Sequence, residues 1–161
     1  MSLLEQTIVV PVDGRQSPTA LAVGRGAQRL LVALGHSCVC ELPLASGRRA
    51  DLVAVRHDGE IWIIEIKSSI EDFRVDQKWP EYRLHCDRLY FATAAHVPPE
   101  IFPQDAGLIV ADAYGGELLR EAPEHRLHAT TRRSMMLAFA HAAARRLHAL
   151  NDPQGPYREE L

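Results

Sequence analysis

The chain has 161 residues, of which 47% are hydrophobic and 24% charged, and its formal net charge is −3. These values predict one globular domain over 1–161 with a substantial core, and they exclude a disordered chain. No apolar run approaches the roughly 20 residues that a membrane helix needs, and the first residues lack the basic start of a secretory signal. We therefore expect a cytoplasmic or nucleoid-associated protein without membrane contact.

The three cysteines are an odd number without regular spacing, which argues against a disulfide framework. Cys38 and Cys40 share one face of a predicted strand, where we interpret them as small core residues. A Cys/His metal site that adds His36 or His85 is the weaker alternative, because the usual spacings of zinc ligands are absent.

The first half of the chain changes from a helical pattern to a β-strand pattern. Its predicted elements are a turn-rich loop at 11–18, a helix at 19–34 that Gly35 ends, and strands at 37–44, 51–56 and 60–67. The last two strands are apolar on both faces, which is typical of a central sheet covered by helices.

The second half adds further helices and a second hairpin. Its predicted elements are a helix at 69–78, a short helix from Pro80 to His85, a strand at 88–93, hairpin strands at 107–112 and 117–121, and a helix at 134–150. The apolar stripe of that last helix consists of Met136, Phe139, Ala143, Leu147 and Leu150. This order predicts an α/β layer sandwich with a central mixed β-sheet flanked by helices, an added hairpin and a C-terminal helix. We place the core at about 19–94, the C-terminal additions at 95–150 and a frayed tail at 151–161.

The loop between the two apolar strands decides where Asp51 lies. A two-residue loop would put Asp51 and Glu65 on opposite faces of the sheet. A three-residue loop over 57–59, with Gly59 in a left-handed conformation, sets Asp51 opposite Glu65. We predict the three-residue loop. Glu65 and Lys67 then share one face, because side chains alternate along a strand.

Two carboxylates on neighbouring strands, roughly 5 Å apart at Cβ, repel each other, and a bound cation would offset that repulsion. Asp51, Glu65, the backbone carbonyl of Ile66 and waters are ligands that suit Mg²⁺ or Mn²⁺. Lys67 beside the ion could orient or deprotonate the attacking water, or stabilise the transition state. All lysine and arginine positions except 67 and 78 are arginines. A lysine at position 67 is therefore consistent with a chemical role, because the pKa of lysine shifts more readily than that of arginine.

Asp51 followed by a hairpin and Glu65-x-Lys67, in a helix–strand–strand–strand–helix–strand order, resembles the PD-(D/E)XK nuclease superfamily. The resemblance implies a restriction-endonuclease-like fold and metal-dependent cleavage of phosphodiesters, mostly in DNA. Asp51 and Glu65 match its metal ligands, Lys67 matches its catalytic lysine, and Ala50 replaces the proline that names the motif. The stretches 48–51, 65–69, 72–74, 78–82 and 86–91 resemble more closely the bacterial MmcB-type DNA repair proteins, which implies a role in DNA repair.

Further candidates for nucleic-acid contact are Arg25, Arg29, Arg49, Lys78 and Tyr82. Arg25 and Arg29 lie one helical turn apart and could guide a DNA backbone, although solvated charge explains them equally well. Lys78 could hold a phosphate, and Tyr82 or Trp79 could stack on a base; for Trp79 we favour packing onto the sheet. Glu41 could add a metal ligand from the neighbouring strand.

The basic residues gather late in the chain, where they could touch phosphates or form a solvated helix face. They are Arg120, Arg126, Arg132, Arg133, Arg145 and Arg146. Two functions remain open: a Mg²⁺- or Mn²⁺-dependent deoxyribonuclease of either endo- or exonuclease type in DNA repair, and a non-catalytic nuclease-like module that binds DNA or a partner. The negative net charge favours the second. A homodimer or a repair-protein partner would then supply the area needed to hold a duplex.

Overall fold

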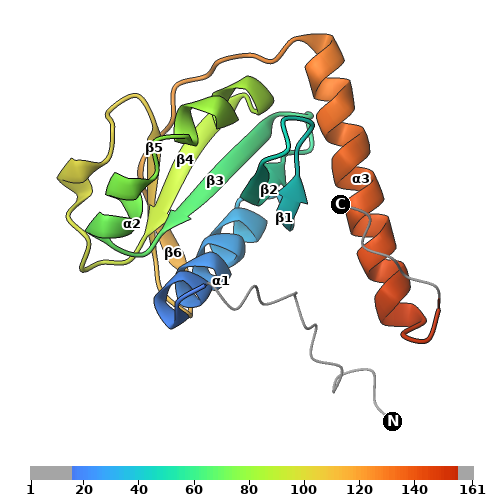
Figure 1. Cartoon of the computed structure of the whole chain (residues 1–161), viewed down its shortest axis with the longest axis horizontal. Coiled ribbons are helices and arrows are strands. Elements are labelled where there is room, and N and C mark those ends of the chain that lie inside the picture. Colours follow the sequence, from blue (N-terminus) through green and yellow to red (C-terminus); the bar gives the residue numbers. More distant parts are fainter. Residues whose placement is uncertain (1–15, 156–161) are drawn as a thin grey trace.

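The computed structural model describes residues 16–155, and at its centre is a six-stranded mixed β-sheet flanked by helices (Figure 1). The strands are β1 (Ser37–Pro43), β2 (Arg49–Val55), β3 (Ile61–Lys67), β4 (Arg88–Thr93), β5 (Gly107–Ala111) and β6 (Gly116–Arg120). They lie side by side in chain order, parallel from β3 to β5 and antiparallel elsewhere. The predicted α/β layer fold with a mixed sheet, an added hairpin and a C-terminal helix is therefore confirmed. Residues 11–15 of the predicted loop and 156–161 of the predicted tail lie outside the described residues.

Helices pack on both faces of the sheet. The helical elements are α1 (Pro18–Ala33), α2 (Ile70–Val75), the 3-10 helices η2 (Trp79–His85) and η3 (Pro99–Ile101), and α3 (Ala129–Asn151). Along β3 the even-numbered Trp62 and Ile64 belong to the buried cluster under α1. The odd-numbered Ile61 and Ile63 belong to the cluster under η2 and α3. The same alternation directs Glu65 and Lys67 away from α1 and toward α2 and η2.

The hairpin between β2 and β3 has the predicted three-residue loop. The N–H of Arg56 donates to the carbonyl oxygen of Glu60 at 2.9 Å, which closes the loop. Gly59 has a φ of +88°, the left-handed conformation that the third loop residue requires. The antiparallel register of the two strands, continued past the last ladder pair, sets Asp51 opposite Glu65.

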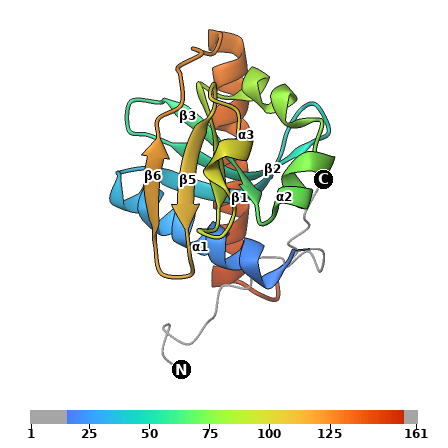
Figure 2. The same ribbon diagram turned by 90° about the vertical axis from the view of Figure 1, so that its left-hand side faces the viewer.

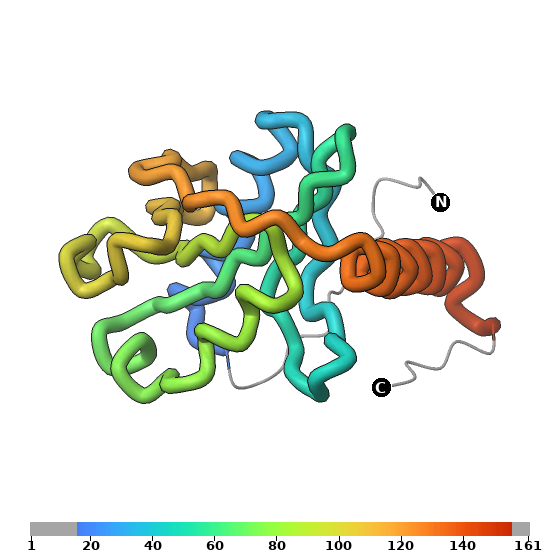
Figure 3. The backbone as a smooth tube through the Cα atoms, turned by 90° about the horizontal axis from the view of Figure 1, so that it is seen from above, coloured from blue at the N-terminus to red at the C-terminus, as the bar shows by residue number. Residues whose placement is uncertain are grey.

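Between β6 and α3 the chain passes over one end of the sheet. Figure 2 looks at the β6 edge, with α3 on the far side, and Figure 3 shows the connecting segment running over the molecule to α3. The segment covers 121–128 and passes from β6 to the start of β4. Asp87 anchors it: the Asp87 carbonyl accepts the N–H of His125 at 2.7 Å, and the carboxylate accepts the N–H of Leu127 at 2.9 Å.

The helix predicted at 69–78 is shorter than expected, because α2 ends at Val75. Ser69 caps its start as predicted. Asp76 ends the helix with an extended backbone, and its carboxylate accepts the N–H of Lys78 at 2.9 Å. Such a local bond from side chain to backbone competes with helix formation, which explains the early end.

The C-terminal helix starts earlier than predicted and packs through part of the predicted stripe, because Met136, Phe139 and Ala143 contact the cluster under η2 and α3. It begins at Ala129 instead of Ser134. Leu147, which was predicted on the packed stripe, is 58% exposed. Met135 is buried instead, and Arg146 donates hydrogen bonds to two backbone carbonyls of β1. The charged end of Arg146 therefore takes part in the packing of α3 on the sheet.

The three cysteines are free, and Cys38 and Cys40 pack as core residues in agreement with the prediction. Cys38 and Cys40 are half-buried beside the cluster under α1, and Cys86 is buried on the other face. The described part of the chain contains no group of three His, Cys, Asp or Glu side chains placed to hold a metal, so the Cys/His alternative gains no support. Over the same residues no helix has both the length and the apolar character to cross a membrane.

Candidate functional site

Five of the predicted site residues meet in one pocket of about 340 Å³ at the carboxyl end of β3. β2 contributes Asp51, β3 contributes Glu65, Ile66 and Lys67, and η2 contributes Tyr82. The other lining residues are Gln16, Ser17, Ala20, Ser68, Asp72 and Asp76. The pocket thus lies between the start of α1, the ends of β2 and β3, and the segment that contains α2 and η2.

Asp51 and Glu65 hold each other's strands through crossed hydrogen bonds. The backbone N–H of Asp51 donates to Oε1 of Glu65 at 3.2 Å. The N–H of Ile66 donates to Oδ2 of Asp51 at 2.8 Å. These side-chain bonds continue the contact between β2 and β3 beyond the last ladder pair. Both carboxylates are therefore held in place before any ligand binds.

The local environment makes a full negative charge on both carboxylates unfavourable. Burial raises the pKa of Asp51, and the N–H of Ile66 and the charge of Lys67 offset only part of that rise. Glu65 is 3% exposed, and burial, followed by the Asp51 charge, raises its pKa well above the usual value. A cation or a proton between the two groups would relieve the repulsion.

Lys67 is buried beside this pair, but its ion-pair partner is Asp76. The Lys67 side chain is 9% exposed, and its Nζ lies 2.7 Å from Oδ2 of Asp76. Burial lowers the pKa of Lys67, but the hydrogen bond and charge of Asp76 outweigh it, so that the pKa is raised overall. An ammonium group held in this way suits the stabilisation of developing negative charge better than proton abstraction.

Glu41 lies next to the pocket but does not line it. Its φ of 51° is in the left-handed region, which is rare for a residue other than glycine. Its carboxylate lies 2.6 Å from Nε of Arg49 and accepts a 2.9 Å hydrogen bond from Gln16.

The hydroxyl of Tyr82 donates to the Arg49 carbonyl at 3.0 Å, and Tyr82 is 8% exposed. Tyr82 thus fixes the strand that carries Asp51, and its burial does not fit base stacking.

The remaining predicted nucleic-acid contacts, Arg25, Arg29 and Lys78, are exposed and lie outside the pocket lining. Arg29 donates to the carbonyl of Tyr114 at 3.1 Å. Trp79 makes an edge contact with a buried phenylalanine, with ring centroids 5.3 Å apart, as the packing interpretation predicts. Among residues 16–155, the structure therefore places neither a base-stacking ring nor a cation other than Lys67 in the pocket itself.

The late basic cluster is divided between the fold and the surface. Arg120 donates to the carbonyl of Ala106 at 2.9 Å, Arg132 pairs with the carboxylate of Asp87 at 2.7 Å, and Arg146 binds the backbone of β1. The exposed members are Arg126, Arg133 and Arg145. Half of the predicted phosphate-binding cluster is thus used to hold the fold together.

Asp72 and Asp76 are pocket residues that the sequence reasoning did not assign to the site. Asp72 accepts the N–H of Ser68 at 2.9 Å and so closes the turn between β3 and α2. The only sequence signal for either residue was its place in an acidic segment just after Lys67. That signal is weak, since acidic residues at the start of a helix are common for reasons of capping and helix dipole.

The donor set fits a hard divalent cation with several water ligands. The described residues show no three-residue metal cluster, so an ion here would take Asp51 and Glu65 as its carboxylate ligands. The carbonyl of Ile66 and waters would complete an oxygen shell, which is the coordination that Mg²⁺ prefers. The buried, mutually repelling carboxylates provide the unbalanced negative charge that such an ion would neutralise.

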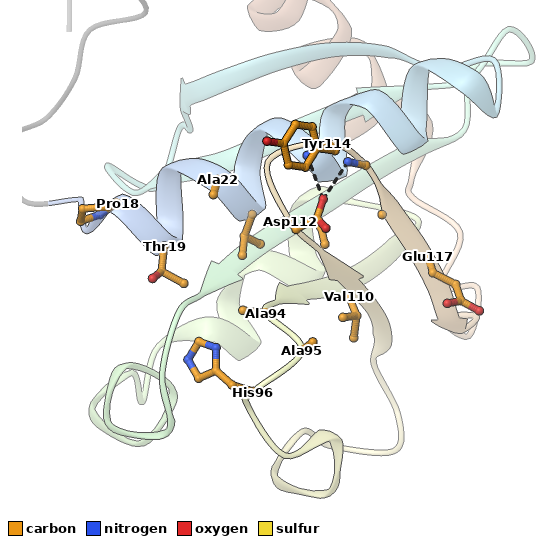
Figure 4. Close-up of a pocket in the computed structure, with 14 residues that line it drawn as sticks. Pro18, Thr19, Ala22, Ala94, Ala95, His96, Val110, Asp112, Tyr114 and Glu117 are labelled. Atoms are coloured by element: carbon orange, nitrogen blue, oxygen red, sulfur yellow. Dashed lines mark hydrogen bonds between the residues drawn. The ribbon is translucent and has the colours of Figure 1, made fainter.

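A second, larger pocket of about 960 Å³ lies on another face of the first turns of α1 (Figure 4). Pro18, Thr19 and Ala22 line one wall, and the segment 94–96 after β4 lines the wall opposite. The carboxylate of Asp112 at its rim accepts the N–H of Tyr114 at 2.8 Å. Within the part of the chain that the structure describes, no arginine or lysine lines this pocket.

Comparison with known proteins identifies relatives of the whole domain. The family model described as DNA repair protein MmcB-like matches residues 8–154. The solved structure of a protein of unknown function from Silicibacter pomeroyi is 41% identical in sequence and superposes with a TM-score of 0.85. That similarity covers 90% of this chain and 99% of the other chain. No curated protein matches the sequence.

Proposed function

The chain belongs to the MmcB-like DNA repair protein family, and from this premise we propose that it is a divalent-metal-dependent deoxyribonuclease that acts in DNA repair. The observation that supports the proposal is the pocket in which Asp51, Glu65 and Lys67 meet. Two carboxylates on neighbouring strands, a half-buried Asp51 and a buried Glu65, with a lysine two residues beyond Glu65, form the pattern of the PD-(D/E)XK nucleases that the sequence resembles. We include the chain in that superfamily as part of the proposal.

Each residue has a role that follows from its position. Asp51 and Glu65 would hold Mg²⁺ or Mn²⁺ together with the carbonyl of Ile66. When bound, such an ion supplies a water of lowered pKa and neutralises charge on the phosphodiester. Lys67 stabilises negative charge on the phosphate oxygens as it develops, because its ammonium is held in the same pocket. Tyr82 keeps the strand of Asp51 in place through its bond to the backbone.

A non-catalytic module that binds DNA or a partner protein is the second candidate. Two observations favour it: the net charge is −3, and Arg120, Arg132 and Arg146 are used inside the fold. These three arginines are then not free to neutralise the phosphates of a duplex. A homodimer or a repair-protein partner would supply the missing area.

The experiment that separates the two candidates is cleavage of labelled single-stranded, duplex and branched DNA with Mg²⁺ or Mn²⁺. Lys67→Ala should lower kcat by about 100-fold or more, the usual effect of removing one group that stabilises the transition state. Lys78→Ala is the matched control, because Lys78 is the only other lysine and lies outside the pocket. A phosphate contact at Lys78 would change KM and leave kcat unchanged.

Wild-type cleavage by a folded Lys67→Ala variant would contradict the nuclease proposal. Absence of cleavage by a folded, metal-binding wild type would favour the binding module. For that module, DNA binding should weaken steeply as salt concentration rises, and a flat salt response would argue against phosphate contact.

A further inference from the structure

The position of Lys67 depends on a carboxylate that belongs to a different element. Its Nζ lies 2.7 Å from Oδ2 of Asp76, in the turn that follows α2. Within residues 16–155 Asp76 is the ion-pair partner of Lys67 at 4.0 Å or less, although Asp51 and Glu65 line the same pocket. Lys67 therefore lies near the carboxylate pair without forming a salt bridge to it.

Asp76 is itself held firmly. Its backbone N–H donates to the carbonyl of Phe73, its Oδ1 accepts the N–H of Lys78 at 2.9 Å, and its Oδ2 faces Lys67. The Asp76 side chain is 19% exposed, so water screens the pair only in part. Asp72 lines the same pocket, but its Oδ2 is occupied by the N–H of Ser68. Of the acidic residues in α2 and the turns next to it, Asp76 is thus the one placed to hold Lys67.

We propose that Asp76 is a positioning residue that holds the Lys67 ammonium on the α2 side of the pocket, away from Asp51 and Glu65. A lysine has four rotatable bonds, and an unheld ammonium would turn toward the nearest buried negative charge, the carboxylate pair. A direct salt bridge there would neutralise the charge that is meant for a cation. Asp76 prevents this and keeps Lys67 beside the place where a phosphate would bind. The consequence for catalysis rests on the proposed nuclease function, whereas the position of Lys67 does not.

Acylation of lysines measures the position of Lys67 without any need for activity. The chain has two lysines, so the exposed Lys78 is an internal reference for the buried Lys67 in the same molecule. The wild type and variants are treated with an acylating reagent in metal-free buffer, and modification at each lysine is followed by mass spectrometry. Asp76→Asn keeps an oxygen for the N–H of Lys78 and removes only the charge. Glu71→Gln, which changes an exposed carboxylate of α2, is the matched control.

In Asp76→Asn the ratio of Lys67 to Lys78 acylation should fall by about fivefold or more, because the ammonium moves from the partly exposed Asp76 to the more deeply buried Asp51–Glu65 pair, where the reagent reaches it less easily. Asp76→Glu should return the ratio toward the wild-type value, and the Glu71→Gln control should leave it unchanged. If Asp76→Asn does not fold, Asp76→Ser provides the same test, since a serine hydroxyl can still accept the N–H of Lys78. An unchanged ratio in a folded Asp76→Asn or Asp76→Ser protein overturns the proposal.

The cleavage assay then tests the consequence for catalysis. Asp76→Asn should lower kcat by about 10–100-fold with little change in KM, the effect of a misplaced catalytic group, and Asp76→Glu should recover part of it. Loss of cleavage with an unchanged acylation ratio would mean that Asp76 acts in another way, and it overturns the positioning role. If the wild type does not cleave DNA, the nuclease function fails, while the acylation ratio still decides whether Asp76 positions Lys67.

Discussion

Replacing Glu65 by glutamine should make the metal-free protein more stable. Two negative charges roughly 5 Å apart repel by about 3 kcal/mol at an effective dielectric constant of about 20. Burial and the Asp51 charge raise the pKa of Glu65, so uptake of a proton removes this repulsion as pH falls toward the raised pKa. The gain in the free energy of unfolding should therefore be about 1–3 kcal/mol for Glu65→Gln. The glutamine oxygen can still accept the N–H of Asp51.

Urea unfolding in the presence of EDTA measures this difference. Because the pKa of Glu65 is higher in the folded state, the folded protein binds the proton more tightly than the unfolded chain does. The stability from this proton is fully present below the unfolded pKa of about 4.3 and is lost as pH rises toward the folded value. The advantage of Glu65→Gln should therefore be largest at neutral pH and shrink in acid. A variant that is less stable than the wild type at neutral pH in EDTA would refute the electrostatic reasoning.

Two further predictions concern the parts of the fold that hold the site in place. Arg132→Met should lower the free energy of unfolding by about 3–5 kcal/mol, because Asp87 is 1% exposed and would lose its counter-ion. Urea unfolding measures this loss, and adding Asp87→Asn to the same protein should recover part of it. An Arg132→Met protein as stable as the wild type would contradict this prediction. Burial lowers the pKa of His36, whose two ring nitrogens have no hydrogen-bond partner among residues 16–155, so the unfolded chain takes up a proton that the folded state resists. Stability should thus fall as pH drops below about 6.5, and it should fall less in His36→Phe; equal pH dependence in the two proteins would count against the assignment.

The central part of the pocket could be predicted because it depends on local structure. The relative placement of Asp51 and Glu65 follows from one hairpin, and Gly59 selects its loop type. Two strands that pair through such a loop have only a few possible registers, and side-chain alternation then puts Glu65 and Lys67 on one face.

The contacts that could not be predicted are those made across the fold. The sequence does not distinguish an arginine whose guanidinium faces solvent from one that, like Arg146, binds the backbone of a distant strand. The early start of α3 accompanies the pairing of Arg132 with Asp87, which are 45 residues apart. The early end of α2 depends on the side chain of Asp76, whose second oxygen binds Lys67. Hydrophobic periodicity and helix propensity do not account for such bonds between distant residues, so the observed boundaries of both helices differ from the predicted ones.

The most direct test of the metal site is calorimetric titration of Mn²⁺ into the folded, metal-free wild type, Asp51→Asn and Glu65→Gln. Loss of a carboxylate ligand should weaken binding by at least about tenfold, so we predict clear binding to the wild type and much weaker binding to both variants. The contrary result is a wild type that does not bind Mn²⁺, or variants that bind it as tightly as the wild type does. In either case Asp51 and Glu65 would not form a metal site.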